Sequence, residues 1–292
     1  MVSTTEQAIP HAEIEPERLD SKDLGLAAGL LIGRVLFETD ELHFGYWDQG
    51  LEVKLANLPA AQERYSEFLL SNIPEGVKTI LDVGCGAGKF AERLIAAGYE
   101  VEAVCPSPLL VSEAQKRLGA DVRINLMPFD EFETDKQYDL VLFSESFQYV
   151  DMADALPRAA RYAKPGGHLM ICDFFQKGTP GRRYIRGGAK LKQFEPLIEA
   201  SPFENIVDLD ITEQTSPTQD IANDVIVRLG GPLVGLIRSS LRQRHPWIAK
   251  IAEWRLKKKL EKMERKYFSG MRSGAHFREF LSYRLLVYKK PS

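Results

Sequence analysis

The chain has 292 residues, enough for one large α/β domain with additions or for two small domains. Its 44% hydrophobic and 27% charged residues are typical of a soluble globular protein, and its net charge of −3 excludes a global basic field for nucleic acid. The three cysteines, Cys85, Cys105 and Cys172, lack metal-ligand spacing and lie in or beside apolar runs. We therefore expect reduced, buried thiols in a cytoplasmic protein without a metal site.

Residues 1–75 are expected to precede the main domain. Residues 1–23 are acidic and polar, which predicts a disordered tail rather than a signal peptide. The apolar run 24–37 is too short to span a bilayer and is expected to be a helix. The cluster Glu41-Leu-His-Phe-Gly-Tyr-Trp47 is expected to form a lid, because Tyr and Trp give large, rigid contact surfaces with a polar edge. An amphipathic helix is predicted from Leu55 to Asn72.

Strand and helix patterns alternate through residues 76–212, the signature of a parallel sheet with helical crossovers. Residues 213–278 have helical character broken by prolines, and we interpret them as a helical cap inserted before the final core strand in 279–292. The predicted strands are Thr79–Val83, Glu100–Val104, Val122–Leu126, Tyr138–Phe143, a strand reaching Cys172, Ile206–Ile211 and Tyr283–Tyr288. Helices are expected near 89–97, 109–118, 151–163 and 187–200.

The predicted strand Thr79–Val83 runs into Gly84-Cys-Gly-Ala-Gly88 and then into an apolar-periodic helix. Glycines let a ligand approach bare backbone N–H groups at the start of a helix. No Gly-Lys-Ser/Thr follows, which excludes a phosphate-binding NTPase loop, and the Gly-x-Gly-x-Gly spacing is not the dinucleotide fingerprint. Asp82 precedes the first glycine by two residues, where it would repel a diphosphate and attract an ammonium group.

This stretch closely resembles motif I of the class I S-adenosylmethionine (SAM) methyltransferases. The resemblance covers roughly His43 to Cys172, and the His-x-Gly-Tyr-Trp stretch and the Lys164-Pro-Gly-Gly turn are similar to small-molecule methyltransferases of the tocopherol, quinone and sugar type. It implies an α/β fold with a Rossmann-like, seven-stranded, mostly parallel sheet. The N-terminal helical lid and the helical cap would be additions to that sheet.

The resemblance also implies a site for SAM across the carboxyl ends of the first, second and fourth strands. The residues expected to bind the cofactor are Tyr46, Asp82, Gly84, Cys85, Gly86, Gly88, Cys105, Pro106, Ser107, Asn125, Leu126, Met127 and Ser144. The residues expected to bind the acceptor are Trp47, Phe147, Gln148 and Tyr149. Glu145 and His43 are the candidate catalytic bases, which are needed only if the acceptor must lose a proton.

Two positions depart from the family pattern. Cys105 stands where the family places the acid that grips the ribose hydroxyls, and no histidine follows Glu145-Ser146.

The predicted function is transfer of a methyl group from SAM to a small, fairly apolar acceptor in an enclosed pocket, without a nucleic-acid partner. The alternative is a catalytically inactive SAM-fold protein for binding or scaffolding, which Cys105 favours. The acceptor atom and the oligomeric state are left open.

Residues 238–266 carry eleven Lys or Arg residues and three Glu, a local charge of +8 that leaves −11 in the rest of the chain. Trp247, Ile251 and Trp254 belong to a rough apolar stripe within this segment. We favour a solvated helix face stabilised by Glu–Lys pairs. Peripheral contact of this basic helix with an anionic membrane, or with an acidic partner, is the alternative.

Overall fold

The computed structural model of the protein describes residues 25, 29–35, 39–48 and 50–292. The tail expected over residues 1–23 lies outside the described residues, as do both ends of the helix expected over 24–37. Residues 29–35 of that run are helical. Among the residues described, no helix is both long and apolar enough to cross a membrane.

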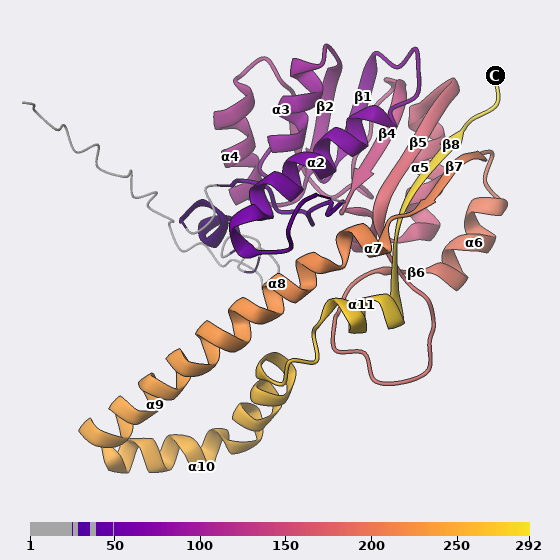
Figure 1. The fold of residues 1–292 in the computed structure, drawn as a ribbon. Helices are drawn as coiled ribbons and strands as arrows, with labels where there is room; N and C mark the ends of the chain where they lie inside the picture. The colour runs from indigo at the N-terminus through magenta and orange to yellow at the C-terminus, as the bar shows by residue number, and fades with distance from the viewer. Residues whose placement is uncertain (1–24, 26–28, 36–38, 49) are drawn as a thin grey trace, which may run out of the picture.

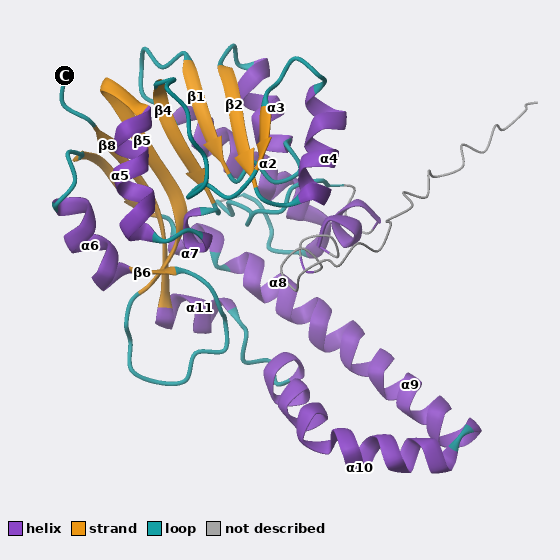
Figure 2. Ribbon diagram, turned by 180° about the vertical axis from the view of Figure 1, so that it is seen from behind, coloured by secondary structure: helices purple, strands orange, loops and turns teal. Residues whose placement is uncertain are grey.

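The core is an eight-stranded sheet in the order β3-β2-β1-β4-β5-β8-β7, with the short β6 paired to β5 (Figures 1 and 2). Strands β1 to β5 are parallel in this order, and β8 runs antiparallel between β5 and β7. The fold class predicted from the sequence is therefore confirmed. The strands are β1 (Thr79–Val83), β2 (Glu100–Cys105), β3 (Ile124–Leu126), β4 (Tyr138–Ser144), β5 (Ala163–Gln176), β6 (Ala189–Lys190), β7 (Glu204–Asp210) and β8 (Leu281–Lys289).

Helices cover both faces of the sheet, because side chains of opposite parity along each strand point to opposite faces. Alternating residues of β1, β4, β5 and β8 pack on α5 and α6 on one face and on α2, α3 and α11 on the other. The helices are α2 (Leu58–Ser71), α3 (Lys89–Ala96), α4 (Pro108–Leu118), α5 (Met152–Tyr162), α6 (Leu191–Glu199), α7 (Thr212–Thr215), α8 (Pro217–Val225), α9 (Gly231–Arg244), α10 (Pro246–Met263) and α11 (Gly274–Phe280). Helix α6 begins later than the predicted 187–200, because Gly187 and Gly188 have positive φ and β6 follows them.

The segment expected to be a cap forms an arm instead. Helix α8, the π-helical turn Ile226–Gly230 and α9 run away from the sheet, and α10 returns beside α9 (Figures 1 and 2). Arg238 of α9 lies 2.6 Å from a carboxylate oxygen of Glu264, which joins the two sides of the arm. None of the residues of α9 is buried. The two ends of the segment contact the expected lid: Ile221 of α8 packs on Trp47, and the ring of Phe277 in α11 lies 5.6 Å from that of Phe44.

An aromatic cluster anchors the face of the sheet covered by α5 and α6. The Phe175 side chain is fully buried, with its ring 5.2 Å from that of Phe194 and 6.4 Å from that of Phe147. Phe147 was expected to bind the acceptor, but it too is fully buried, against Phe143 and Phe194. Its place is therefore in the core.

Phe175→Ala is expected to lower the free energy of unfolding by about 3–5 kcal/mol, because it removes a fully buried ring and leaves a cavity. Tyr149→Ala removes an aromatic ring that is 58% exposed and should change the same quantity by about 0.5 kcal/mol or less. Urea unfolding followed by circular dichroism measures both. Equal midpoints for the two variants would contradict this assignment of the core.

Candidate active site

The glycine turn Gly84–Gly88 joins β1 to α3 at the carboxyl edge of the sheet. Gly84 has φ +85°, and a Cβ there would collide with the Cβ of Ser146, so the loop after β4 packs directly on the turn. Gly88 has φ +78°, and a Cβ there would lie 3.0 Å from Ala114 of α4. The turn therefore needs glycine at both positions, and it presents bare backbone between the ends of β1, β2 and β4.

Asp82 is the buried acid of this turn. Its side chain is 2% exposed, and Oδ2 has no hydrogen-bond partner within the described part of the chain. Burial raises the pKa of Asp82 to about 7. A buried carboxylate without a partner is costly, so its position beside a glycine turn indicates a site for a cationic ligand group. These residues fit the ammonium group of SAM.

Glu145 is a second acid at this edge, and it is partly buried. It follows β4 in a left-handed conformation, φ +53°, which is strained for a non-glycine residue. Its Oε1 accepts hydrogen bonds from the Phe44 N–H at 2.6 Å and the Tyr283 hydroxyl at 2.7 Å. The Tyr65 hydroxyl lies 2.8 Å from that of Tyr283, so a chain of hydroxyls leads from α2 through β8 to this carboxylate. Burial raises the pKa of Glu145, and the positive charge of His43 opposes that shift.

A third acid, Asp173, lies at the neighbouring end of β5 and was not predicted from the sequence. It accepts hydrogen bonds from the backbone and side chain of Gln148 at 3.0 and 3.1 Å and from the Phe174 N–H at 2.8 Å. Burial, and then the charge of Glu145, raise the pKa of Asp173 to about 8. The one signal in the sequence was an acid inside the apolar run 169–175. Gln148, expected at the acceptor, holds this carboxyl group in place.

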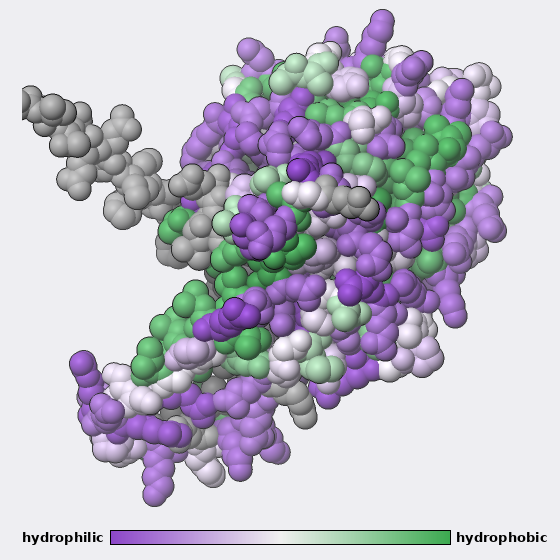
Figure 3. Space-filling model, viewed as in Figure 1, coloured by the Kyte–Doolittle hydropathy of each residue, from purple (hydrophilic) through white to green (hydrophobic). Residues whose placement is uncertain are grey.

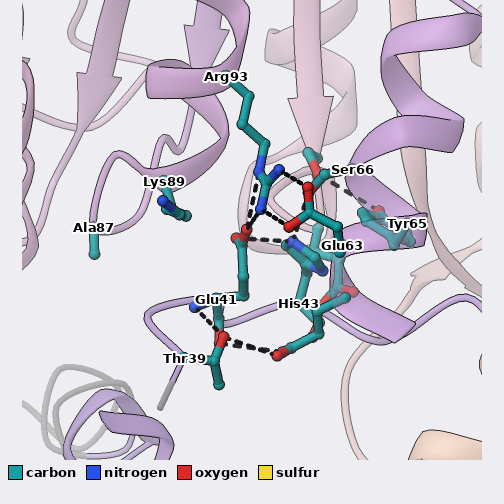
Figure 4. Close-up of polar contacts among 12 residues, drawn as sticks. Thr39, Glu41, His43, Glu63, Tyr65, Ser66, Ala87, Lys89 and Arg93 are labelled. Carbon is teal, nitrogen blue, oxygen red and sulfur yellow. Dashed lines mark hydrogen bonds and ion pairs between the residues drawn. The ribbon is translucent and has the colours of Figure 1, made fainter. Parts of the chain in front are cut away.

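His43 lies in a polar network that fixes the N-terminal segment (Figure 4). Its Nε2 is 2.9 Å from Oε2 of Glu41, and its Nδ1 is 2.7 Å from the Phe44 carbonyl oxygen. Burial favours the neutral ring, but the hydrogen bond and charge of Glu41 outweigh it and raise the pKa of His43. Both ring nitrogens face acceptors, so the geometry favours a doubly protonated ring. As it lies, His43 has no free lone pair for the role of base.

Arg93 extends the same network to two helices. Its guanidinium, on α3, contacts Glu41 at 3.2 Å and also binds Glu63 of α2 (Figure 4). Beyond the network, the N–H of Tyr46 donates to the Ala61 carbonyl, and that of Trp47 donates to the Gln214 carbonyl, each at 2.8 Å. The expected lid is therefore a segment bonded to α2, to α3 and to the residues around α8.

Four other residues expected to contact SAM have partners within the protein: Cys85, Cys105, Ser107 and Asn125. Cys85 and Cys105 are buried in one cluster with Leu30, from the helical residues 29–35, and with Leu110. The Ser107 hydroxyl caps α4 by accepting from the Leu110 N–H at 3.4 Å. Asn125 donates to the carboxylate of Glu102 and to the Ala103 carbonyl, each at 3.0 Å.

The remaining predicted contacts differ in exposure and in the residues they pack on. Leu126 and Tyr149 are 50% and 58% exposed, and Pro106 is also exposed. Met127 packs on the core, and Tyr46 stacks on Phe68 at 4.8 Å. Ser144 lies within 3.5 Å of the Tyr65 hydroxyl. Across the residues that the structure describes, no cluster of His, Cys, Asp and Glu could hold a metal ion.

A family model described as a methyltransferase domain matches residues 58–206. The chain belongs to this methyltransferase family. An uncharacterized methyltransferase of Mycobacterium tuberculosis is 34% identical over 101 residues, which are 33% of this chain and 40% of that protein. Methyltransferase GfsG of Streptomyces halstedii is 28% identical over 207 residues, 63% of this chain and 73% of that protein. The chain thus spans less than half the length of the mycobacterial relative.

Solved structures confirm the fold. The [4+2]-cyclase SpnF matches with a TM-score of 0.64 at 18% identity, over 92% of this chain and 94% of that one. Geranyl diphosphate C-methyltransferase of Streptomyces coelicolor A3(2), in complex with Mg²⁺, geranyl diphosphate and S-adenosyl-L-homocysteine, matches with a TM-score of 0.61 at 16% identity, over 86% and 91% of the two chains. The family model confirms the predicted methyltransferase family. The S-adenosyl-L-homocysteine named with the geranyl diphosphate C-methyltransferase agrees with the expected SAM cofactor. These comparisons lend no support to the inactive alternative.

SAM binding is expected to depend on pH through Asp82, because only the carboxylate attracts an ammonium group. With a pKa of about 7 in the free protein, the affinity for SAM should fall up to about tenfold per pH unit below 7 and level off just above it. Isothermal titration calorimetry between pH 5.5 and 7.5 measures this. The stability of the ligand-free protein should show the opposite trend with pH. Its folded-state pKa lies above the unfolded value, so the contribution of Asp82 to stability falls as pH rises through 7.

Asp82→Asn is the matching variant, since it keeps the shape of the side chain and removes its charge. It should abolish the pH dependence of SAM binding and weaken the affinity at pH 7.5. It should also raise the melting temperature of the ligand-free protein at that pH, because it removes a buried charge whose Oδ2 accepts no hydrogen bond from the described residues. Unchanged SAM affinity in this variant would remove Asp82 from the cofactor site.

Proposed function

We propose that the protein is a SAM-dependent methyltransferase whose acceptor is a small, fairly apolar molecule that reacts beside Glu145. The observation that carries this proposal is the presence of a buried and a partly buried carboxyl group at one edge of the sheet. Oδ2 of Asp82 has no hydrogen-bond partner among the described residues and lies beside the glycine turn, while Glu145 precedes the serine that packs on Gly84. One acid suits a cationic cofactor and the other suits an acceptor that must lose a proton.

Groups of the chain itself would hold the cofactor. Asp82 would hold the ammonium group, and the backbone of Gly84–Gly88 would lie along the cofactor. Bound SAM supplies a methyl group made electrophilic by its sulfonium. Cys105, at the end of β2, would lie at the ribose and offer no charged acceptor for its hydroxyl groups.

Glu145 is the proposed base. Its Oε1 is fixed by the Phe44 N–H and the Tyr283 hydroxyl, so little reorganisation is needed to present the carboxylate. Burial raises its pKa, which makes it a stronger proton acceptor than a solvated carboxylate. The proton of an acceptor hydroxyl, or of an activated carbon, would pass to this group. The nearby positive charge of His43 would keep Glu145 ionised before the reaction.

The surroundings of Glu145 support an apolar acceptor. The Phe44 ring lies 5.6 Å from the rings of both Phe277 and Tyr283 and 5.9 Å from that of Phe174. Apolar walls with a few convergent polar groups are typical of small-molecule sites. The rings of Phe174, Phe277 and Tyr283 are buried in the core, and Phe44 is the partly buried ring of the group. We therefore propose Phe44 as an apolar contact of the acceptor, in place of Phe147. One neighbour in fold, a geranyl diphosphate C-methyltransferase, is named for an isoprenoid substrate.

Glu145→Gln is expected to lower the methyl-transfer rate by about 10²–10⁴ and to leave SAM affinity within about threefold, because it removes a proton acceptor outside the cofactor contacts. S-adenosylhomocysteine formation is measured with a panel of apolar phenols, enols and amines. Glu67→Gln, at an exposed position of α2, is the matched control and should keep the full rate. Full activity of Glu145→Gln on every acceptor that the parent methylates would refute Glu145 as the base. It would indicate an amine acceptor, which needs no base.

Cys105→Asp restores the acid that the family uses at the ribose. It should tighten SAM binding by up to about tenfold, because a charge-assisted hydrogen bond replaces a thiol contact. Cys105→Ser is the neutral control and should change the affinity by less. A weaker affinity for Cys105→Asp than for Cys105→Ser would show that the end of β2 does not contact the ribose.

A further inference from the structure

Helix α10 carries an aromatic stripe that faces solvent. Trp247, Ile251 and Trp254 are 67%, 52% and 79% exposed. Their spacings of four and three residues place them on one face of the helix. Two tryptophans this exposed on one helix face are unusual for a surface that meets only water.

Basic side chains border this stripe. At 3.6 residues per turn, Lys250 and Lys257 lie on one side of it, Arg255 lies on the other, and Lys258 continues it. All four residues are exposed. Residues 238–266 as a whole hold eleven Lys or Arg and three Glu. The face therefore combines interfacial aromatic rings with positive charge.

The outgoing side of the arm adds a second apolar row. Leu229, in the π-helical turn, and Leu233, Leu236 and Ile237 of α9 are 53–68% exposed. Their spacing again places them on one helix face. Apolar surface runs along this part of the arm, with hydrophilic side chains toward its tip (Figure 3).

We propose that the arm binds the surface of a membrane that contains anionic lipids. Trp247 and Trp254 would lie at the level of the headgroups, and the flanking Lys and Arg side chains would meet lipid phosphates. This proposal rests on the arm alone and does not depend on the proposed reaction. Nucleic acid would use the positive charge but would leave the Leu and Ile row in water. A second copy of the arm would bring like charges together.

The test is partition of the full chain into vesicles. Neutral phosphatidylcholine vesicles are compared with vesicles that contain about 30% phosphatidylserine, by co-sedimentation and by tryptophan fluorescence. Binding should occur on the anionic vesicles, weaken with salt, and shift the emission to shorter wavelength. The chain has three tryptophans, and Trp47 is already buried, so the shift would report Trp247 and Trp254.

Two variants separate the contributions of the arm. Trp247→Ser combined with Trp254→Ser should weaken partition by about tenfold or more and abolish the fluorescence shift. Lys250→Glu, Lys257→Glu and Lys258→Glu together should weaken it by more than about thirtyfold. Leu256→Ser lies on the opposite face of α10 and is 42% exposed in the parent, so it is the matched apolar control. Lys54→Glu, Lys190→Glu and Lys192→Glu match the charge change at exposed positions outside the arm.

The controls should bind like the parent, and all variants should keep the parent's circular dichroism spectrum. Absence of partition into anionic vesicles would overturn the proposal. So would equal partition of the Trp variant and the parent. Binding of duplex DNA without vesicle binding would assign the face to nucleic acid instead. Dimerisation that the Trp variant loses, again without vesicle binding, would assign it to a second copy.

Discussion

The carboxylate of Glu145 joins parts of the chain that are distant in sequence. It receives the Phe44 N–H from the N-terminal segment and the Tyr283 hydroxyl from the final strand, while its own backbone sits in a left-handed turn after β4. Each bond reaches across more than one hundred residues. A partly buried carboxylate without such donors would be destabilising, so the N-terminal segment and β8 must both be in place for the site to form.

The need to position the Phe44 N–H explains the ion pairs that fix the N-terminal segment. Glu63 pairs with Arg93, Arg93 pairs with Glu41, Glu41 pairs with His43, and the residue after His43 presents its N–H to Glu145. The charges alternate along this series, so each buried group has an opposite charge or a donor beside it. Removing one member would leave its neighbours unpaired, and the effect would reach the site without any contact to substrate.

The sequence was most informative where the relevant contacts are local. The strand–turn–helix unit around Asp82 was predicted to within one residue, because glycine positions and apolar periodicity are properties of neighbouring residues. Tyr65 and Tyr283 escaped prediction, since their hydroxyls meet across 218 positions and no local pattern links them. His43 was predicted as a base because a histidine near a site is often one, and only the structure shows Glu41 against Nε2. The helices of the arm were expected, but their direction depends on packing that periodicity does not encode.

The burial of Leu30 against Cys85, Cys105 and Leu110 has a consequence for how any ligand would enter. The side chain of Leu30 packs on these residues, so a ligand that contacts them must first displace the helix of residues 29–35. The observed affinity is then the intrinsic affinity multiplied by the fraction of molecules in which that helix has moved. The rate of ligand association would also depend on the movement of this helix. At high ligand concentration the rate of association would level off at the rate at which the helix leaves, rather than rise toward the diffusion limit.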